Sequence, residues 1–416
     1  MNNKIFLQIA SYRDPELVPT IKDCIKNAKH PENLVFSIAW QHSIDDAWDN
    51  LDEFKDDPRF RIHDIDYKSS KGACWARNLL QQYYIDEDYT LQLDSHHRFI
   101  ENWDEECINM IKELQLNGYK KPMITGYIPS FDPENDPDGR VMLPWKMNFD
   151  RFIPEGAVFF LPATIDNYKE LTAPIPARFY SAHFCFTLGQ FVKEVPHDPN
   201  YYFHGEEISI GVRAYTHGYD LFHSHKVLCW HEYTRKGRTK QWDDDKNWVA
   251  KNNESHRRNR VLFGMDGEIQ NIDFGPYGFG NERYISDYER YAGISFKKRG
   301  VQKYTLDNNI APNPPLYGKE FDDSFLQIFK HCIDIYIPQV PLNDYDFWAV
   351  IFEDENNNSL YREDADVNEI SRIKNDNGDG YYKVWRTFNT EKRPSQWVVW
   401  PHSISQGWCE KLTGKL

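Results

Sequence analysis

The sequence predicts an α/β fold followed by a smaller β-rich module. Strand and helix patterns alternate over the first hundred residues, a proline-rich stretch follows at 307–318, and strand patterns dominate after it. Strands that alternate with helices favour a mostly parallel sheet with helices on its faces. We therefore expect one large domain over 1–306, a linker over 307–318 and an antiparallel β-rich accessory domain over 319–416.

The alternation begins at the N-terminus. Apolar runs and apolar residues at helical spacing predict, in order, a strand at 4–10, a helix at 17–27, strands at 34–40 and 60–65, a helix at 72–84 and a strand at 89–93. Ligands of such sheets bind beyond the carboxyl ends of the strands. Functional residues are therefore expected in the segments 11–13, 41–46 and 94–96.

The rest of the large domain is less regular. Residues 118–176 are rich in proline, and SFDPENDPDGR (130–140) is typical of an exposed loop. Beyond it the patterns predict a strand at 180–187, a helix at 206–217 and one strand at 221–230 that leads into His231. After the linker, the segments DFWAVIFEDENNNSLYRED, YYKVWRTF and QWVVWPHS predict the strands of the β module.

The composition excludes several classes of protein. With 40% hydrophobic and 15% aromatic residues among 416, the chain is globular. A net charge of −15 opposes binding to nucleic acid and anionic lipid. We expect no membrane span and no signal peptide, because the apolar runs are short. Seven cysteines without a CxxC pair predict reduced thiols and a cytoplasmic location.

Two segments carry candidate metal ligands. Asp94 and His96 follow the strand at 89–93, and a carboxylate and an imidazole two residues apart can ligate one divalent cation. A polar turn is the alternative interpretation. Downstream, His231 precedes a basic loop, which suits a diphosphate beside a cation but also fits a solvated charge run. The loop cations are Arg235, Lys236, Arg238 and Lys240, and the alternative ligands are His223 and His225.

Two predicted helices begin with charged residues. Glu206 and Glu207 open the helix at 206–217, where they could complement the helix dipole or bind substrate hydroxyl groups. Lys71 precedes the helix at 72–84, whose N-terminus could face a phosphate, and Arg77 lies one turn in. A surface cation on a helix is the alternative for Arg77.

Four motifs in the right order carry a family resemblance. SYRDPEL (11–17), KGACWARN (71–78), QLDSHHRFIENWD (92–104) and HGEEISIGVRAYTHGYDLF (204–222) resemble the cytoplasmic-type polypeptide GlcNAc-transferases over roughly residues 3 to 265. The DSH triplet and the later histidine are similar, more distantly, to the polypeptide GalNAc-transferases. Both resemblances imply a GT-A fold, with a Rossmann-like mixed sheet flanked by helices, and a retaining transfer from a UDP-sugar that depends on manganese and a DxH motif.

The resemblance also implies roles for individual residues. The metal, manganese with magnesium as an alternative, would be held by Asp94, His96 and His231. The catalytic set would be Arg77, Glu206 and Glu207. The donor-binding set would be Ser11, Tyr12, Arg13, Asp45, Lys71, Asp94, Ser95 and Arg238, with Asp46 as the alternative to Asp45. Independently of the resemblance, the exposed character of the loop at 130–140 suggests a flap on the acceptor side.

The implied reaction moves GlcNAc from UDP-GlcNAc to a hydroxyl of a protein, peptide or glycan. UDP-GalNAc or UDP-glucose as donor stays open, and the acidic chain favours a neutral or basic acceptor. A non-catalytic carbohydrate-binding protein on the same scaffold is the alternative from another class. Its basis is the aromatic β module, which holds Trp348, Trp385, Trp397, Trp400 and Trp408.

Overall fold

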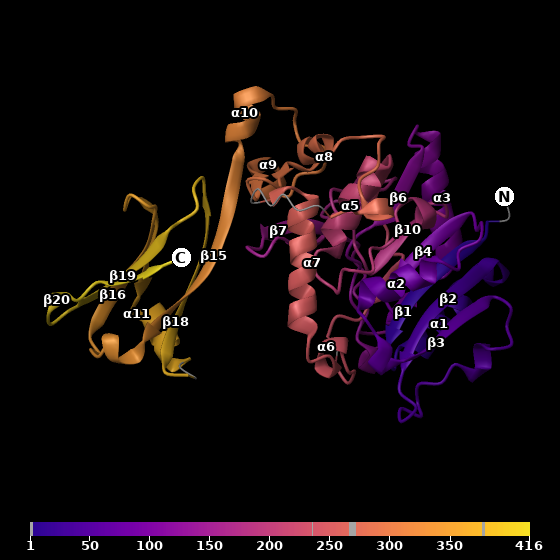
Figure 1. Ribbon diagram of the computed structural model, residues 1–416, viewed down its shortest axis with the longest axis horizontal. Coiled ribbons are helices and arrows are strands. Elements are labelled where there is room, and N and C mark those ends of the chain that lie inside the picture. Colours follow the sequence, from indigo (N-terminus) through magenta and orange to yellow (C-terminus); the bar gives the residue numbers. More distant parts are fainter. Residues whose placement is uncertain (1–2, 235, 266–271, 377–378) are drawn as a thin grey trace. The chain divides into compact units, whose positions relative to one another are not determined.

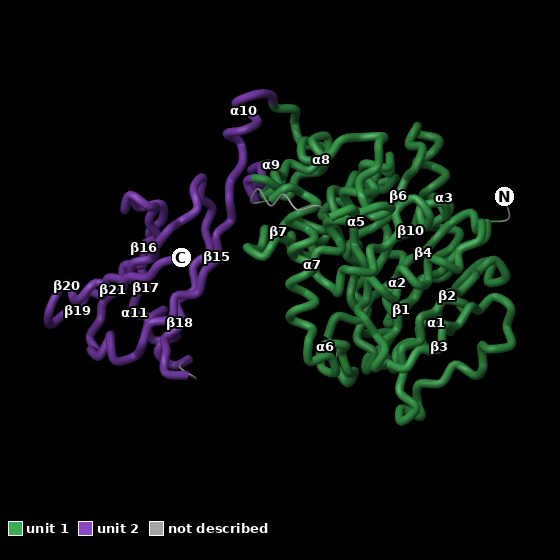
Figure 2. The backbone as a smooth tube through the Cα atoms, viewed as in Figure 1, with its two compact units in different colours: residues 1–297, 304–316 green, residues 298–303, 317–416 purple. Residues whose placement is uncertain are grey.

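The computed structural model describes residues 3–234, 236–265, 272–376 and 379–416. The chain forms two compact units (Figure 2). The first, called the α/β unit here, comprises residues 1–297 and 304–316, and the second, the β unit, comprises 298–303 and 317–416. Part of the stretch expected to be a linker is anchored in the α/β unit, because the Arg178 guanidinium donates to Asn313 Oδ1 and to the Asn309 carbonyl, both at 2.6 Å.

A mixed eight-stranded sheet organises the α/β unit (Figure 1). Its strand order is β3-β2-β1-β4-β10-β6-β11-β9. The first four of these strands run parallel, whereas β10 runs antiparallel to both β4 and β6. The strand bounds are β1 Ile5–Tyr12, β2 Leu34–His42, β3 Phe60–Asp66, β4 Tyr89–Leu93, β6 Lys121–Thr125, β9 Ile175–Pro176, β10 Phe184–Leu188 and β11 Tyr219–His223.

Helices cover both faces of this sheet. Alternate residues of β1 separate the faces: Ile5, Leu7 and Ile9 join a core cluster with residues of α1 and α3, while Phe6 packs with Val35 and Val192 on the other face. Burial of both faces explains why the strands are almost continuously apolar. The helices are α1 Leu17–Asn27, α2 Ala73–Gln81, α3 Trp103–Leu116, α4 Phe191–Glu194, α5 Glu206–Thr216, α6 Gln241–Asp244, α7 Trp248–Leu262, α8 Ile285–Ala292 and α9 Lys303–Leu306.

The structure corrects three expected elements. The single strand expected over 221–230 is two strands, because the Ser224 hydroxyl bonds to the backbone of Lys226 and closes a turn after β11. The second strand, β12 Cys229–His231, pairs with β5 His97–Phe99 instead of joining the large sheet. The strand expected from residue 180 begins only at Phe184. The irregular stretch contains a hairpin of β7 Trp145–Phe152 and β8 Val158–Thr164.

The β unit is built from antiparallel strands, with the helix α11 in its core. Its core unites residues of different strands with the helix, among them Ile333, Trp348, Val384 and Ile370. Two sheets contribute, one with β15 and β18 and one in the order β17-β16-β19. The bounds are β14 Gly300–Gln302, α10 Gly318–Asp323, β15 Phe325–Tyr336, β16 Tyr345–Glu353, β17 Ser359–Asp366, α11 Val367–Asn375, β18 Tyr381–Thr390, β19 Gln396–Ser403, β20 Gly407–Trp408 and β21 Leu412–Lys415.

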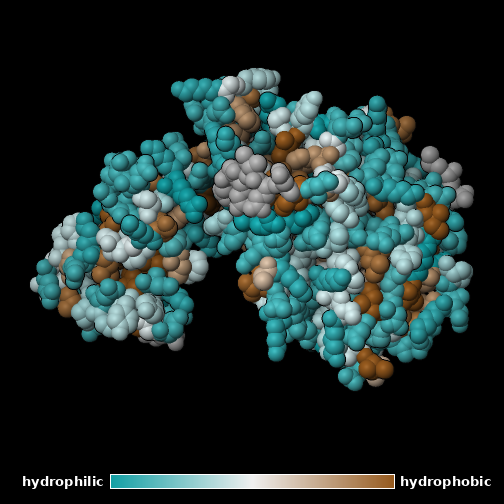
Figure 3. All heavy atoms as spheres, viewed as in Figure 1, coloured by the Kyte–Doolittle hydropathy of each residue, from teal (hydrophilic) through white to brown (hydrophobic). Residues whose placement is uncertain are grey.

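The fold class expected from the sequence is therefore confirmed: a mixed sheet flanked by helices is followed by antiparallel β structure. The surface seen in Figure 3 is mostly hydrophilic, with hydrophobic residues in scattered patches. Within the described ranges, no helix has both the length and the apolar character needed to cross a bilayer.

Candidate active site

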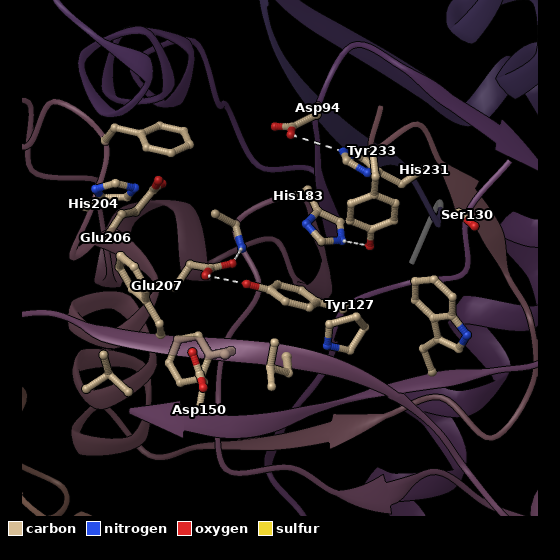
Figure 4. Close-up of a pocket in the computed structure, with 18 of the residues that line it drawn as sticks. Asp94, Tyr127, Ser130, Asp150, His183, His204, Glu206, Glu207, His231 and Tyr233 are labelled. Carbon is tan, nitrogen blue, oxygen red and sulfur yellow. Dashed lines mark hydrogen bonds and ion pairs between the residues drawn. The ribbon is translucent and has the colours of Figure 1, made fainter. Parts of the chain in front are cut away.

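Three predicted metal ligands meet at the carboxyl end of β4. Asp94 follows that strand, His96 lies two residues on, and His231 is brought opposite His97 by the pairing of β12 with β5. One ligand atom from each of Asp94, His96 and His231 lies within 4.8 Å of the other two. His231 Nε2 is 3.4 Å from Asp94 Oδ2 (Figure 4), and His96 Nε2 is 3.7 Å from the same oxygen.

The chemistry of this cluster fits a divalent transition metal. One carboxylate and two imidazoles are donors that manganese accepts. Burial and the neighbouring His183 hold the pKa of His231 well below its usual value, so that the ring stays neutral, the state that can ligate a metal. Burial raises the pKa of Asp94, but the hydrogen bond with His231 and the charge of Arg77 outweigh it and hold that pKa well below normal.

A second carboxylate fixes the orientation of His96. Asp14 Oδ2 lies 2.7 Å from His96 Nδ1 and accepts the Ser95 hydroxyl at the same distance. Burial raises the pKa of Asp14, but the neighbouring His96 and Arg238 together lower it by a larger amount. The net pKa is below normal, so the side chain is a carboxylate. This contact leaves Nε2 of His96 to face Asp94, as is usual for histidines that bind metals. Arg238 also donates to Asp14 Oδ2, at 2.8 Å, and its Nη1 is 3.0 Å from His96 Nε2.

An arginine links the metal cluster to the acidic helix start. Arg77, in the second turn of α2, donates from Nη2 to Asp94 Oδ1 at 2.7 Å and from Nη1 to Glu206 at 2.6 Å. Burial raises the pKa of Glu206, but the charge of Arg77 outweighs it and brings that pKa to about 2. His197 Nδ1 lies 2.8 Å from Glu206 Oε1. Two of the expected catalytic residues thus lie in one ion-pair network with Asp94.

The loop before α5 requires a glycine. Gly205 has φ +91°, and a Cβ at this position would lie 2.3 Å from the Asn259 amide nitrogen. Only glycine adopts this conformation without steric cost. The turn directs Glu206 toward Arg77 and Glu207 toward a different pair of donors.

Glu207 accepts from neutral donors, whereas Glu206 binds the Arg77 guanidinium. Its Oε1 accepts the Ala182 N–H at 3.0 Å and its Oε2 accepts the Tyr127 hydroxyl at 3.1 Å (Figure 4). Burial raises the pKa of Glu207 to about 7. Glu207 is therefore close to half protonated at neutral pH, and it can both donate and accept hydrogen bonds.

A cavity of about 870 Å³ opens beside these groups. Arg77, Asp94, His231, Glu206 and Glu207 line one side of it. The hairpin β7–β8 and the loop before α5 contribute the other sides, with Trp145, Asp150, Val158, Phe159, Phe160, Leu161, Pro162, Phe203 and His204. Figure 4 shows Glu206, Glu207, Tyr127, His183 and Asp150 around the cavity.

The expected nucleoside-binding residues are not among those that line this cavity. Tyr12 and Arg13 at the end of β1 both contact Asp244, at 2.8 and 3.1 Å. Of the two aspartates expected near the nucleoside, Asp45 is exposed and Asp46 accepts from Arg13 Nε at 2.7 Å. Ser11 is buried, and its carbonyl accepts the Gln41 side-chain amide.

The sequence singles out three other residues, Lys71, His223 and Arg235. Lys71 and His223 do not line the cavity. Lys71 is exposed, with its ammonium 5.9 Å from the centre of the Trp75 ring. His223 is not a ligand, because its Nδ1 is bonded to the Thr125 carbonyl and its Nε2 accepts the Met147 N–H. Arg235 lies outside the described residues.

Some residues of the site escape prediction from the sequence. Asp14 stands in the SYRD segment, directly after the expected nucleoside-binding residues, and this position was its only signal. His183 stacks on His231 with ring centres 4.4 Å apart, and its Nε2 lies 3.1 Å from the Tyr233 hydroxyl. Neither His183 nor Tyr127 belongs to a motif with recognisable spacing.

Comparison with known proteins gives the family. A family model described as Glycosyltransferase (GlcNAc) matches residues 4–58 and 50–298, well over half of the chain. No curated protein matches the chain. Among solved structures, GalNAc-T7 with UDP, GalNAc and Mn²⁺ is similar, with 13% identity, a TM-score of 0.46 and coverage of 68% of this chain and 56% of that chain.

S. aureus TarS 1–349 in complex with UDP-GlcNAc matches with 10% identity and a TM-score of 0.38, over 58% of this chain and 61% of that chain. Both matches therefore span less than two thirds of the length of the solved chain. The family match confirms the resemblance found in the sequence motifs, and the chain belongs to the Glycosyltransferase (GlcNAc) family.

Proposed function

We propose that this protein transfers GlcNAc from UDP-GlcNAc to a hydroxyl of a protein, peptide or glycan, with retention of configuration and with a divalent cation, most simply manganese. One observation carries the proposal: Asp94, His96 and His231 converge at the carboxyl end of β4, beside a cavity that also holds Arg77, Glu206 and Glu207. Family membership supports the same reaction class.

The proposal gives each group a task. Asp94, His96 and His231 would hold the cation, which when bound neutralises the diphosphate and eases its departure. Arg77 is held by Asp94 and Glu206, so its guanidinium is fixed close to where charge develops on the leaving group. Ser11, Tyr12 and Arg13 at the end of β1, with Asp45 or Asp46 after β2, would contact the nucleoside, in line with ligand binding at strand ends.

The acceptor would approach from the face that the diphosphate leaves. A phosphate oxygen of the donor can then accept the proton of the attacking hydroxyl, so that the chain needs no separate general base. Glu206 is an ion-paired carboxylate and would orient hydroxyl groups of the sugar. Glu207, with its pKa raised to about 7 by burial, can donate or accept a hydrogen bond to the sugar or the acceptor.

The compartment and the division of the chain follow as further parts of the proposal. All seven cysteines are free thiols, five of them buried, which supports a reducing compartment such as the cytoplasm. The transferase domain would cover residues 1–306, and residues 319–416 would act as an accessory domain.

The test is release of UDP from a set of UDP-sugars without any acceptor, with and without manganese. Slow hydrolysis of UDP-GlcNAc that stops when a chelator is added supports donor, metal and reaction class together. Faster hydrolysis of UDP-GalNAc or UDP-glucose would replace the donor but keep the chemistry. Failure to hydrolyse any donor, together with failure to bind UDP in calorimetry, would favour the non-catalytic carbohydrate-binding alternative.

A further inference from the structure

We propose that the outward face of the two paired strands β15 and β18 is a binding site for a neutral glycan, a chain of β-linked pyranose rings with equatorial hydroxyl groups. The site lies in the β unit, apart from the cavity described above, and does not depend on the transferase reaction. Its basis is a row of exposed aromatic rings, Tyr336, Tyr381 and Trp385, which are not part of the core cluster of that unit.

Strand β18 alternates between buried and exposed residues along its whole length. Tyr382 and Val384 belong to the core cluster, so the period of two places Tyr381 and Trp385 on the opposite face. A strand with one buried face usually carries polar residues on the other. Here Trp385 is 57% exposed and Tyr381 is 42% exposed. Packing in the core therefore does not explain these two rings.

The neighbouring strand β15 extends the aromatic face (Figure 1). Tyr336 is 50% exposed and lies directly opposite Tyr381, with ring centres 5.6 Å apart. Trp385 is four residues further along β18, which corresponds to about 13 Å in an extended strand. The aromatic rings at the two ends of this span can therefore be covered by successive sugar rings of one short oligosaccharide.

Charged side chains of both signs separate the aromatic rings. Lys383 stands between Tyr381 and Trp385 on the same face of β18. Its partner on β15 is Asp334, and the Lys330 ammonium lies 5.5 Å from the centre of the Trp385 ring. An ammonium donates hydrogen bonds and a carboxylate accepts them. Hydroxyl groups beside the aromatic rings would thus find partners of both kinds.

This combination of rings and charges favours a neutral glycan. A pyranose ring with equatorial substituents has apolar C–H faces and a rim of hydroxyl groups, which complement aromatic rings flanked by polar side chains. Because Lys383 lies opposite Asp334, the charges in the middle of the row oppose each other and favour neither an anion nor a cation.

Two other classes of partner fit less well. The core of a protein–protein interface is depleted of charged residues, whereas here Lys383 and Asp334 occupy the middle of the row. Single-stranded nucleic acid also stacks on aromatic rings, but it needs a positively charged groove. The carboxylate of Asp334 and the net charge of −15 of the chain oppose it.

The experiment is calorimetric titration of the full chain with chitotetraose and, separately, with cellotetraose, in the presence of a chelator. We expect the wild type to bind at least one of these oligosaccharides. Trp385→Ala should weaken that binding at least tenfold and Tyr381→Ala about threefold, because each removes a ring that covers a sugar face. Trp385→Phe, which keeps a ring, should retain most of the affinity.

Trp408→Ala is the matched control. Trp408 is a 45% exposed tryptophan of the same unit, but its ring packs on those of Trp400 and Phe347, with ring centres 4.3 and 5.3 Å apart. This variant should bind the oligosaccharide like the wild type. All the variants should keep the far-UV circular dichroism of the wild type, since each changes an exposed side chain.

Four results would overturn the site. They are absence of binding of both oligosaccharides by the wild type, equal affinity of the wild type, Trp385→Ala and Tyr381→Ala, an equal loss in Trp408→Ala, and tighter binding of a thymidine oligonucleotide than of either sugar. Equal affinity in the ring variants would place the bound sugar elsewhere on the chain, the cavity of the α/β unit included. None of these results bears on release of UDP from a donor, so the proposed function is judged separately.

Discussion

The two units of the molecule bury ionisable groups in different ways. In the α/β unit, Asp14, His96, Arg77 and Glu206 are all buried, and His96 and Arg77 link the other two to the partly exposed Asp94. In the described part of the β unit, the buried charged residues are Asp354, which caps its own turn, and Arg386, which binds Glu369 at 2.6 Å.

The difference shows which unit bears the free-energy cost of burying a cluster of charged groups. Removing charges from water is expensive, and a paired cluster of them rarely stabilises a fold more than apolar packing would. A cluster that converges on one carboxylate at a strand end is therefore evidence for a chemical role. In the β unit the core is apolar and isolated buried charges fix turns and strands, and its described residues hold no comparable cluster.

The largest effect is expected from Asp94→Ala. The change removes a proposed metal ligand and one of the two carboxylates that hold Arg77. Release of UDP from UDP-GlcNAc should fall about a thousandfold at saturating manganese, while far-UV circular dichroism stays that of the wild type. Asp52→Ala, at an exposed aspartate of the same unit, is the control. Turnover close to normal in Asp94→Ala would refute the assignment of the metal site.

A core substitution in the β unit should separate stability from chemistry. Ile333 of β15 is fully buried among Trp348, Val384 and other apolar residues. Ile333→Ala should destabilise the β unit by about 3 kcal/mol, through lost burial and the cavity that remains. Hydrogen exchange of β15 and β16 during urea titration measures this change. If donor hydrolysis fell together with the stability of the β unit, the contrast drawn between the two units would fail.

Much of the α/β fold could be predicted because its signals are local. The bounds of α1 and β4 match the sequence pattern to the residue, since an apolar period over ten residues is independent of distant contacts. The split between β11 and β12 was missed, because an apolar run does not reveal a turn closed by Ser224. No periodicity tells whether β12 joins the large sheet or pairs with β5.

The meeting of the candidate metal ligands could be predicted only in part. Asp94 and His96 follow a recognisable strand, whereas His231 ends β12, a strand whose start and pairing the sequence pattern does not give. Asp14 is 82 residues from His96 in the sequence, and no pattern connects them before the chain folds. Asp46 bonds to Arg13, and no sequence pattern shows which side chain of this loop turns toward that guanidinium.

A substitution of Asp14 should have an effect of intermediate size, on the affinity for manganese. Asp14→Asn keeps the shape but weakens the contact that orients His96, so manganese should bind about tenfold more weakly. Calorimetric titration with manganese alone measures this without any turnover. Ser95→Ala is the matched variant, because it removes one hydrogen bond to Asp14 and keeps the contact between Asp14 and His96. Equal manganese affinity in Asp14→Asn and wild type would show that Asp14 has no role in orienting the ligand.

The last effect concerns the pH dependence of stability. Burial raises the pKa of Glu207 from 4.5 to about 7, so between these pH values the native state keeps a proton that the unfolded state has lost. The free energy of unfolding of the wild type should therefore fall relative to that of Glu207→Gln as the pH rises through this window, by at most about 1.4 kcal/mol per pH unit.

Urea denaturation of both proteins without metal, at pH 5 and at pH 8, gives the difference directly. Groups that titrate equally in the two proteins cancel in this comparison. A carboxylate stabilised by the Tyr127 hydroxyl and the Ala182 N–H would have the opposite sign, because its pKa would be lowered and the wild type would gain stability as the pH rises. The sign of the difference therefore decides whether burial or hydrogen bonding controls Glu207, and with it whether this residue can donate a proton at neutral pH.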